Sequence, residues 1–464
     1  MSKPSIPQGT RDFSPEEVRK RQYIFNTLRS IFELYGFQPL ETPAMENLVT
    51  LTGKYGEEGD RLIFKILNNG LHEKKDVDKE KLNSEWNKVL DKAYSSPAVT
   101  ERALRYDLTI PFARYVVMHQ NELAFPFRRY QMQPVWRADR PQKGRYREFW
   151  QCDADVVGST SLINEAELLC IYQNAFHQLG LPQTAIKINS RKLLAGIAEI
   201  CGMPEAMMDI TIAMDKLDKI GWQGVANELQ QRGISDEGIV QIEKVINVKG
   251  NNDEKLNAYK EIMANSETGL KGISEIQQTL IYHDTLADKG WTATIEVDIS
   301  LARGLNYYTG VIAEVVCRAV QMGSIGGGGR YDDLTGLFGL KGLSGVGVSF
   351  GIDRIYDVME ELKLFPEQLV AGAQVMLVNF GGENERYALS VLQQLRENGI
   401  AAEIYPDAAK FDKQMKYANK RGIQFVILTG DEEREKEMVS LKNFISGNQQ
   451  MLSIREAIDN IKKQ

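Results

Sequence analysis

Residues 126–157 read PFRRYQMQPVWRADRPQKGRYREFWQCDADVV and predict two strands joined by the polar loop ADRPQKGR. Side chains alternate between the two faces of a strand. One face of the second strand therefore carries Arg147, Phe149, Gln151, Asp153 and Asp155. A cation, an aromatic ring, an amide and two carboxylates make a poor core, because unpaired buried charge is costly. This face predicts the lining of a polar-ligand pocket, and the alternative is a sheet face exposed to solvent.

The same segment holds a local excess of positive charge. The whole chain of 464 residues has a net charge of −7, yet residues 128–147 contain seven Arg and Lys side chains against one acid, Asp139. Such a cluster attracts phosphate groups whatever the total charge is. A solvated basic hairpin is the simpler alternative.

Composition excludes several classes of protein. The chain is 43% apolar and 26% charged, which excludes disorder throughout. We find no apolar run long enough for a membrane span and no apolar core of a secretory signal near the first residues. The four cysteines and four histidines are widely spaced, which argues against zinc sites, disulfides and histidine-based metal catalysis. A reducing cytoplasm is the expected location.

The length of 464 residues suggests about three domains, at roughly 150 residues per domain. Ser14-Pro15-Glu16-Glu17 predicts the start of a helix over 15–35 that Gly36 ends. A strand ending near Asp107 and a helix from Pro111 are expected before the hairpin, and a helix over 162–180 after it. A polar helical block follows at about 195–288, then β-segments, and a small α/β domain forms the last 90 or so residues.

Two segments have open interpretations. Residues 71–98 are charged and poor in apolar side chains, and predict an insertion with a helix, either a lid or an incidental surface excursion. The stretch GSIGGGGRYDDL at 323–334 is expected to be a glycine-rich turn, in which Gly326 to Gly329 allow a sharp turn or a close backbone approach.

Two further segments carry groups suited to a ligand. RGLNYYTG at 303–310 offers an arginine and two phenols, although tyrosines of this kind commonly pack in a core. GIDR at 351–354 opens a helix with an arginine in its first turn, which suits a phosphate; a surface ion pair of Arg354 with Asp353 or Asp357 is the alternative. We find no nucleophile elbow and no Walker loop, so the groups suit phosphoryl or nucleotidyl chemistry by positioning.

Together these segments resemble the histidyl-tRNA synthetases, a family of class II aminoacyl-tRNA synthetases. Helix 15–35 with Pro43 is similar to motif 1, VWRADRPQKGRYREFWQCDAD to motif 2 and GVGVSFGIDRI to motif 3, while LRYDLT at 104–109 and LARGLNYYTG at 301–310 are similar to segments specific to the histidyl family. The resemblance implies an α+β fold, in which an antiparallel sheet flanked by helices carries an inserted helical domain and a C-terminal α/β anticodon-binding domain. The implied divisions are 1–190 and 291–366 for the two parts of the catalytic domain, 191–290 for the helical insertion and 372–464 for the anticodon-binding domain.

The resemblance also implies a role for individual residues. The catalytic cations would be Arg137, Arg303 and Arg354. ATP would be bound by Arg137, Arg145, Phe149 and Arg354. Histidine would be bound by Asp107, Leu108, Thr109, Arg137, Gln151, Asp155, Arg303, Tyr307 and Tyr308. Arg140 and Gln142 would approach the acceptor end of tRNA. No side chain is expected to be a metal ligand.

The implied activity is that of an ATP-dependent ligase, which forms histidyl-adenylate from L-histidine and ATP and transfers histidine to the 3′ end of tRNA(His). Magnesium would bridge the phosphates, and the protein would be a cytoplasmic homodimer without membrane contact. The chain departs from the many bacterial members that have a longer acid at Asp107 and Asp155, and Asn306 replaces a common aspartate. Competing interpretations are the regulatory subunit of ATP phosphoribosyltransferase, another class II ligase such as a prolyl- or threonyl-tRNA synthetase, and an RNA-binding module.

Overall fold

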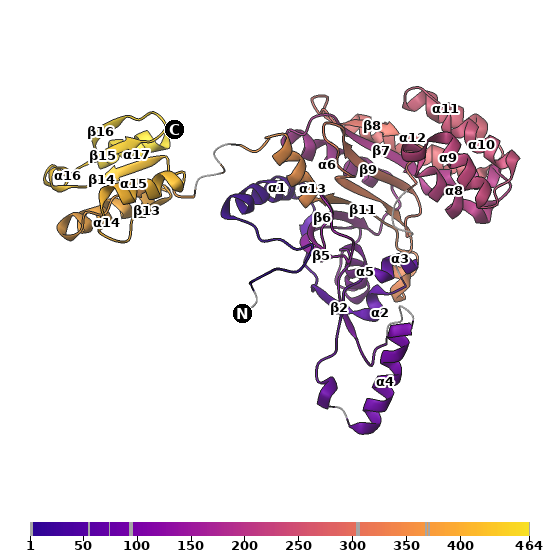
Figure 1. Cartoon of the computed structure of the whole chain (residues 1–464). Coiled ribbons are helices and arrows are strands. Elements are labelled where there is room, and N and C mark those ends of the chain that lie inside the picture. Colours follow the sequence, from indigo (N-terminus) through magenta and orange to yellow (C-terminus); the bar gives the residue numbers. More distant parts are fainter. Residues whose placement is uncertain are drawn as a thin grey trace. The chain divides into compact units, whose positions relative to one another are not determined.

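The computed structural model (Figure 1) describes residues 3–53, 56–73, 75–91, 96–302, 307–366, 369 and 372–463. Contacts between Cα atoms divide the chain into two units. The first comprises residues 1–12 and 21–364, and the second comprises residues 13–20 and 365–464. Helix α1 (Pro15–Leu34) runs through both ranges.

An eight-stranded sheet forms the centre of the first unit in the described part of the chain. The strand order is β1 (Gln38–Pro39), β5 (Phe127–Trp136), β6 (Glu148–Val157), β11 (Gly345–Gly351), β10 (Gly326–Tyr331), β9 (Val311–Cys317), β7 (Thr184–Ser190) and β8 (Thr294–Val297). Neighbouring strands from β5 to β7 are antiparallel, while β1 and β8 at the two edges run parallel to their partners. The expected sheet flanked by helices is confirmed, with parallel edge strands added to its antiparallel middle.

Strands β5 and β6 form the hairpin expected from the sequence, and they pair over ten positions from Phe127 opposite Val157 to Trp136 opposite Glu148. Strand β11 then pairs with β6, so that Gly347 lies opposite Asp155 and Ser349 opposite Asp153. Motifs almost 200 residues apart in the chain therefore lie side by side in the sheet.

Helices cover this sheet and begin where local capping favours them. Helix α1 begins with a capping box, since Glu17 N–H donates to Ser14 Oγ and Ser14 N–H donates to the Glu17 carboxylate. Helix α5 (Thr109–Met118) begins two residues before the expected start at Pro111, because the Asp107 carboxylate accepts the Ile110 N–H at 3.1 Å. Helices α6 (Ile163–Gln178) and α13 (Ile352–Glu361) pack on β11 and β6.

The glycine-rich segment is a strand, so the expected turn is wrong and the close backbone approach is confirmed. Residues Gly326–Tyr331 form β10 between β9 and β11. A Cβ added at Gly328 would lie 2.1 Å from the carbonyl oxygen of Gly347, and one added at Gly326 would lie 2.9 Å from the Tyr172 ring. Glycine is needed here because neighbouring strands and a ring occupy the space of a side chain.

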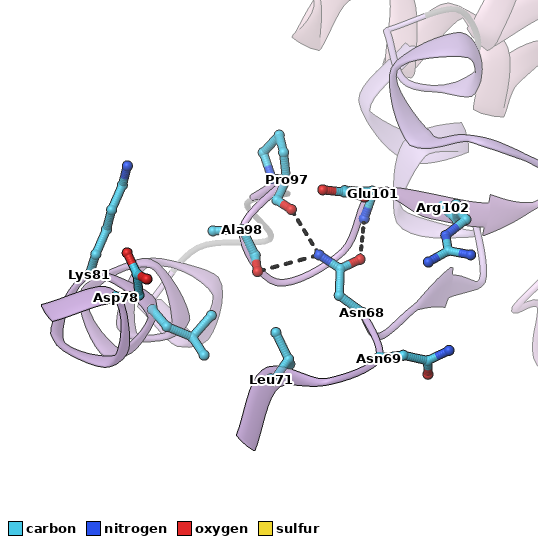
Figure 2. A pocket seen from close by; sticks show the side chains of 10 residues that line it. Asn68, Asn69, Leu71, Asp78, Lys81, Pro97, Ala98, Glu101 and Arg102 are labelled. Atoms are coloured by element: carbon cyan, nitrogen blue, oxygen red, sulfur yellow. Dashed lines mark hydrogen bonds between the residues drawn. The ribbon is translucent and has the colours of Figure 1, made fainter. Parts of the chain in front are cut away.

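The described residues between 71 and 98 form an arm with the expected helix, α4 (Asp76–Asp91), after a 3-10 turn at Leu71–Glu73. Figure 2 shows the base of this arm, where Asn68 donates to the carbonyl oxygens of Pro97 at 2.9 Å and Ala98 at 3.4 Å and accepts from Glu101 N–H at 2.9 Å. A cavity of about 350 Å³ lies there. The arm is joined to a small sheet of β2 (Met45–Asn47), β4 (Arg102–Leu104) and β3 (Lys65–Ile66), beside α2 (Leu48–Leu51) and α3 (Gly56–Arg61).

A block of helices lies between β7 and β8, as expected for residues after 190. Its helices are α7 (Arg191–Ile200), α8 (Met207–Met214), α9 (Leu217–Gln231), α10 (Asp236–Ile246), α11 (Asn252–Ile262) and α12 (Glu267–Leu286), with a 3-10 turn at Pro204–Ala206. The contacts keep this block within the first unit, and its division at 191–290 stays a prediction.

The second unit contains an α/β fold. Its sheet has the order β13 (Ala402–Ile404), β12 (Val375–Leu377), β14 (Phe425–Leu428), β15 (Met438–Asn443) and β16 (Gln449–Ser453). The first three strands are parallel, and the last two extend the sheet as an antiparallel hairpin. Its helices are α14 (Gly382–Glu397), α15 (Phe411–Lys420), α16 (Asp431–Glu435) and α17 (Ile454–Lys462). The expected C-terminal α/β domain is confirmed.

Candidate active site

A cavity of about 600 Å³ lies within the first unit, over strands β6, β10 and β11. Its lining includes seven residues that the sequence predicts for the site: Arg137, Gln142, Arg145, Phe149, Gln151, Tyr308 and Arg354. Glycines 326–328 of β10 also line it, so the strand without side chains leaves space above the sheet. Segments that are far apart in the chain therefore converge on one site.

The cavity gathers positive charge. Arg137 donates from Nε to the Tyr106 carbonyl at 3.1 Å, and its guanidinium carbon lies 5.1 Å from the centre of the Phe149 ring. Arg354 donates from Nε to the Gly144 carbonyl at 2.7 Å and from Nη1 to the Ser324 carbonyl at 2.5 Å. Burial lowers the pKa of Arg354, and repulsion from Arg145 and Arg137 lowers it further. An anion placed among these guanidiniums would relieve that repulsion.

The predicted alternative, a surface ion pair of Arg354 with Asp353 or Asp357, is wrong. Asp353 is buried, where Oδ1 accepts from Arg21 at 2.7 Å and also from Arg11, and Oδ2 accepts the Trp150 N–H at 2.9 Å. Asp357 accepts the hydroxyl of Tyr146 at 2.9 Å. These acids hold α13 against the sheet, while Arg354 faces the cavity.

Alternation along β6 follows the prediction. Phe149 and Gln151 line the cavity, while the Trp150 ring lies 5.0 Å from the Phe25 ring on the other side and Cys152 is fully buried. Asp153 and Asp155 lie deeper, each 2% exposed. Of the five residues predicted to share this face, Phe149 and Gln151 line the cavity, and the two acids continue into the interior. Arg147 does not line it and donates from Nε to the Asp139 carbonyl at 3.1 Å.

A buried cluster of acids surrounds Arg129 of β5. Asp155 forms an ion pair with Arg129 at 2.8 Å and accepts the Tyr331 hydroxyl at 2.7 Å. Burial raises the pKa of Asp155, and the Arg129 charge opposes that rise. Burial raises the pKa of Asp153 to about 7, with Arg129 lowering it and Asp155 raising it. This end of the site favours a cation, because two carboxylates share one guanidinium.

The other predicted residues lie around these two groups. Tyr307 donates to Asp107 at 3.4 Å, and its ring lies 5.0 Å from that of Tyr308. Burial raises the pKa of Tyr308, so its phenol stays protonated. Leu108 is fully buried, and Thr109 is the first residue of α5.

Two predicted residues are not placed at the cavity, and four residues that were not predicted belong to the site. Arg140 is exposed and does not line the cavity, and Arg303 lies outside the described residues. Sequence reasoning missed Tyr106, Arg129, Ser349 and Glu314. Tyr106 lies within the segment LRYDLT. Arg129 could have been predicted from the alternation of side chains along β5, because it lies opposite Asp155 in the hairpin. Among the described residues there is no group of three His, Cys, Asp or Glu side chains that could hold a metal ion. No helix in the described ranges is long and apolar enough to cross a membrane.

Comparison with known proteins identifies the family. The family model for histidyl-tRNA synthetase matches residues 72–355, and that for an anticodon binding domain matches residues 374–464. The chain belongs to the histidyl-tRNA synthetase family. Within this family it is 56% identical over 454 residues to the histidine–tRNA ligase of Christiangramia forsetii, covering 97% of each chain. It is 54% identical over 462 residues to that of Bacteroides fragilis, covering both chains fully.

Solved structures agree with this family assignment. The crystal structure of histidyl-tRNA synthetase from Nostoc sp. PCC 7120 matches with a TM-score of 0.82 and 30% identity over 99% of each chain. A structure titled as an ATP phosphoribosyltransferase regulatory subunit/histidyl-tRNA synthetase from Bacillus halodurans matches with a TM-score of 0.71 at 20% identity, over 91% of this chain and 97% of that one. The second likeness concerns the fold alone.

Proposed function

We propose that this chain joins L-histidine to ATP as histidyl-adenylate and then transfers histidine to the 3′ end of tRNA(His). The activity is supported by 54–56% sequence identity to histidine–tRNA ligases over 97–100% of the chain. The observation that carries the site assignment is a single cavity in which guanidiniums gather beside a buried acidic cluster. Such a polarity suits an amino acid that presents its carboxylate to a nucleotide phosphate.

Adenylate formation in this site needs no protein nucleophile. The carboxylate oxygen of histidine attacks the α-phosphorus of ATP, the bond to the bridging oxygen breaks, and pyrophosphate leaves. Arg137 and Arg303 would hold the α-phosphate and the carboxylate, while Arg354 and Arg145 would hold the outer phosphates. Phe149, whose ring lies beside Arg137, would stack on adenine. Guanidiniums stabilise the negative charge that builds on the phosphate as it becomes five-coordinate.

Magnesium fits this site as a companion of the triphosphate. The cavity lining includes the carboxylates of Asp139 and Glu314, and hard cations take oxygen ligands of this kind together with phosphate oxygens. When bound, the ion supplies charge neutralisation on the outer phosphates. Arg145, which lies 3.7 Å from Asp139, would adjust to the same phosphates.

Selection of histidine would depend on the buried polar residues. Asp107, Thr109 and Gln151 would hold the α-ammonium group, and Asp155 with Tyr308 would contact the imidazole, beside Leu108 and Tyr307. Arg129 and Tyr331 fix the Asp155 carboxylate in place, so it presents one geometry to a ring nitrogen. A site built to pair with a substrate's polar groups rejects analogues that leave them unpaired.

Transfer to tRNA would use two separate parts of the chain. Arg140 and Gln142 are exposed in the loop between β5 and β6, where an acceptor end could approach, and residues 372–464 would bind the anticodon. We propose a cytoplasmic homodimer with motif 1 at its interface, with divisions at 1–190, 191–290, 291–366 and 372–464. Limited proteolysis would test these divisions, and light scattering would test the dimer.

Exchange of labelled pyrophosphate into ATP tests the activity directly. We expect exchange with histidine and with none of the other nineteen amino acids. Exchange with proline or threonine would support another class II ligase. Absence of exchange with every amino acid would support the regulatory or RNA-binding interpretations.

A further inference from the structure

Residues 7–11 form a turn that contacts the loop between β5 and β6, and we call them the N-terminal segment. Thr10 donates to the Pro7 carbonyl from its N–H at 3.2 Å and from its hydroxyl at 2.7 Å. Gly9 is the third residue of the turn and has a φ of +86°, a left-handed conformation that glycine adopts without strain. The Gly9 carbonyl accepts the Arg147 N–H of the loop at 2.8 Å.

This contact lies one hydrogen bond away from Arg137. The Arg137 N–H donates to the Arg147 carbonyl at 2.9 Å, so the backbone of Arg147 is bonded to Arg137 on one side and to Gly9 on the other. A Cβ added at Gly9 would lie 2.8 Å from Arg147 Cγ and 2.9 Å from Pro141 Cγ. The N-terminal segment therefore packs closely against the loop as well as bonding to it.

A second contact joins the end of the loop to helix α13. The Arg11 guanidinium carbon lies 3.3 Å from the centre of the Tyr146 ring, and Arg11 also forms an ion pair with the buried Asp353. Arg354, the next residue of α13, donates to the Gly144 carbonyl of the same loop at 2.7 Å. Two separate parts of the chain therefore hold the loop.

We propose that Gly9 and Arg11 are positioning residues, which hold the loop so that Arg137 and Arg145 are aligned with the phosphates of ATP. The inference rests on the proposed role of these two cations in adenylate formation. Surface loops are mobile unless they are tied down, and a misplacement of about 1 Å near a reacting group can cost about 10²-fold in rate. Neither positioning residue is among the described residues that line the cavity, so neither needs to touch a substrate.

Binding of two ligands to Arg11→Ala separates this role from general support of the site. Histidinol has the ammonium group and the imidazole of histidine but lacks the carboxylate that Arg137 would contact. We expect the Kd of ATP, measured by calorimetry, to rise about 5- to 20-fold, because the cations on the loop are no longer aligned. The Kd of histidinol should stay within about twofold of wild type, since its contacts do not include the loop. Arg11→Lys keeps a charge for Asp353 without a planar group on Tyr146, so it should recover only part of the ATP affinity.

Gly9→Ala tests the other contact and has a matched control. Gly233 has a φ of +85° and no atom within 4 Å of an added Cβ, so Gly233→Ala changes the left-handed backbone without a new contact. Both variants should be less stable in urea, because alanine is strained at this φ. We expect the Kd of ATP to rise about 5-fold or more in Gly9→Ala alone, because only that Cβ displaces the loop.

Hydrogen exchange of backbone amides measures the loop without any activity. Peptides that cover residues 138–147 should exchange faster in Arg11→Ala and Gly9→Ala than in wild type, because bonds that hold the loop are lost. Peptides from β10 and β11 should exchange as in wild type.

Three results would overturn the proposal: an equal loss of ATP and histidinol affinity in Arg11→Ala or Gly9→Ala, an unchanged ATP affinity, and an unchanged exchange of the loop amides. If wild type binds ATP but shows no histidine-dependent pyrophosphate exchange, the proposed function fails, while ATP affinity and amide exchange still decide the role of the N-terminal segment. Absence of ATP binding by wild type would overturn both.

Discussion

Removal of the Arg354 guanidinium should strongly slow adenylate formation. Arg354 lies at the start of α13 and donates to carbonyls of two different segments, Gly144 between β5 and β6 and Ser324 before β10. It therefore brings a positive charge to the cavity and fixes two parts of its wall. Arg354→Ala removes both effects, while Arg354→Lys keeps the charge without the planar fork that reaches both carbonyls.

The magnitude follows from the charge distribution. Burial and repulsion from Arg145 and Arg137 lower the pKa of Arg354, which shows that the three cations act on one another across the cavity. Loss of one such donor to a phosphate in the transition state costs about 10²- to 10³-fold in rate. We therefore expect kcat/KM for ATP to fall by about 10²- to 10³-fold in Arg354→Ala and by about 10-fold in Arg354→Lys. Loss of the two hydrogen bonds that the charged guanidinium donates to carbonyls should also lower the free energy of unfolding, by about 1.5–3 kcal/mol per bond less the relieved repulsion from Arg145 and Arg137.

Exchange of pyrophosphate into ATP, measured over a range of ATP concentrations at saturating histidine, gives these ratios. Urea unfolding of the same preparations separates lost stability from lost activity. Arg318→Ala is the matched control, because Arg318 is exposed and pairs with Glu296 away from the cavity lining. A kcat/KM for ATP within threefold of wild type in Arg354→Ala would refute the assignment of this cation to the nucleotide.

Three further predictions concern packing, buried charge and the missing cation. Gly328→Ala places a Cβ 2.1 Å from the Gly347 carbonyl oxygen, so we expect the free energy of unfolding in urea to fall by more than about 3 kcal/mol. In the control Gly351→Ala the nearest atom to the new Cβ lies at 3.4 Å, so the free energy of unfolding should fall much less. Asp353→Ala leaves the buried Arg21 without this partner and should cost about 3–5 kcal/mol, whereas loss of the exposed pair in Glu361→Ala should cost less than about 1 kcal/mol; equal costs would contradict this reasoning. Arg303→Ala should slow single-turnover adenylate formation by about 10²-fold or more with modest loss of histidine affinity, and an unchanged rate would count against its role.

Local patterns in the sequence were sufficient for the main elements of the fold. The capping residues from Ser14 to Glu17 and the stop at Gly36 predicted α1, and the hairpin at 126–157 was predicted with the alternation of its side chains. Strand β10 was misread as a turn because glycine favours turns when its neighbours are unknown. Its glycines are required instead because the Gly347 carbonyl of β11 and the Tyr172 ring occupy the space that side chains at Gly328 and Gly326 would need. That constraint comes from distant segments, which local propensity does not contain.

The site shows the same division between local and long-range information. Phe149 and Gln151 could be placed in a pocket from alternation and residue type. Ser349 could not, because its place in the cavity lining depends on the pairing of β11 with β6, and the register between strands almost 200 residues apart is set by the whole sheet. The ion pair between Arg129 and Asp155 depends likewise on the register of β5 with β6.

The polarity of the cavity connects the fold to the chemistry. Strand β6 carries Phe149 and Gln151 beside the guanidiniums and then continues to Asp153 and Asp155 in the interior. An amino acid bound along this strand would have its positive group near the acids and its carboxylate toward Arg137. A strand advances about 3.3 Å per residue. The distance along β6 from the end of the cavity that favours an anion to the end that favours a cation is therefore little more than the length of one bound amino acid. In the proposed binding mode the sheet would align the carboxylate with the phosphate before reaction, which is a contribution to catalysis that needs no protein nucleophile.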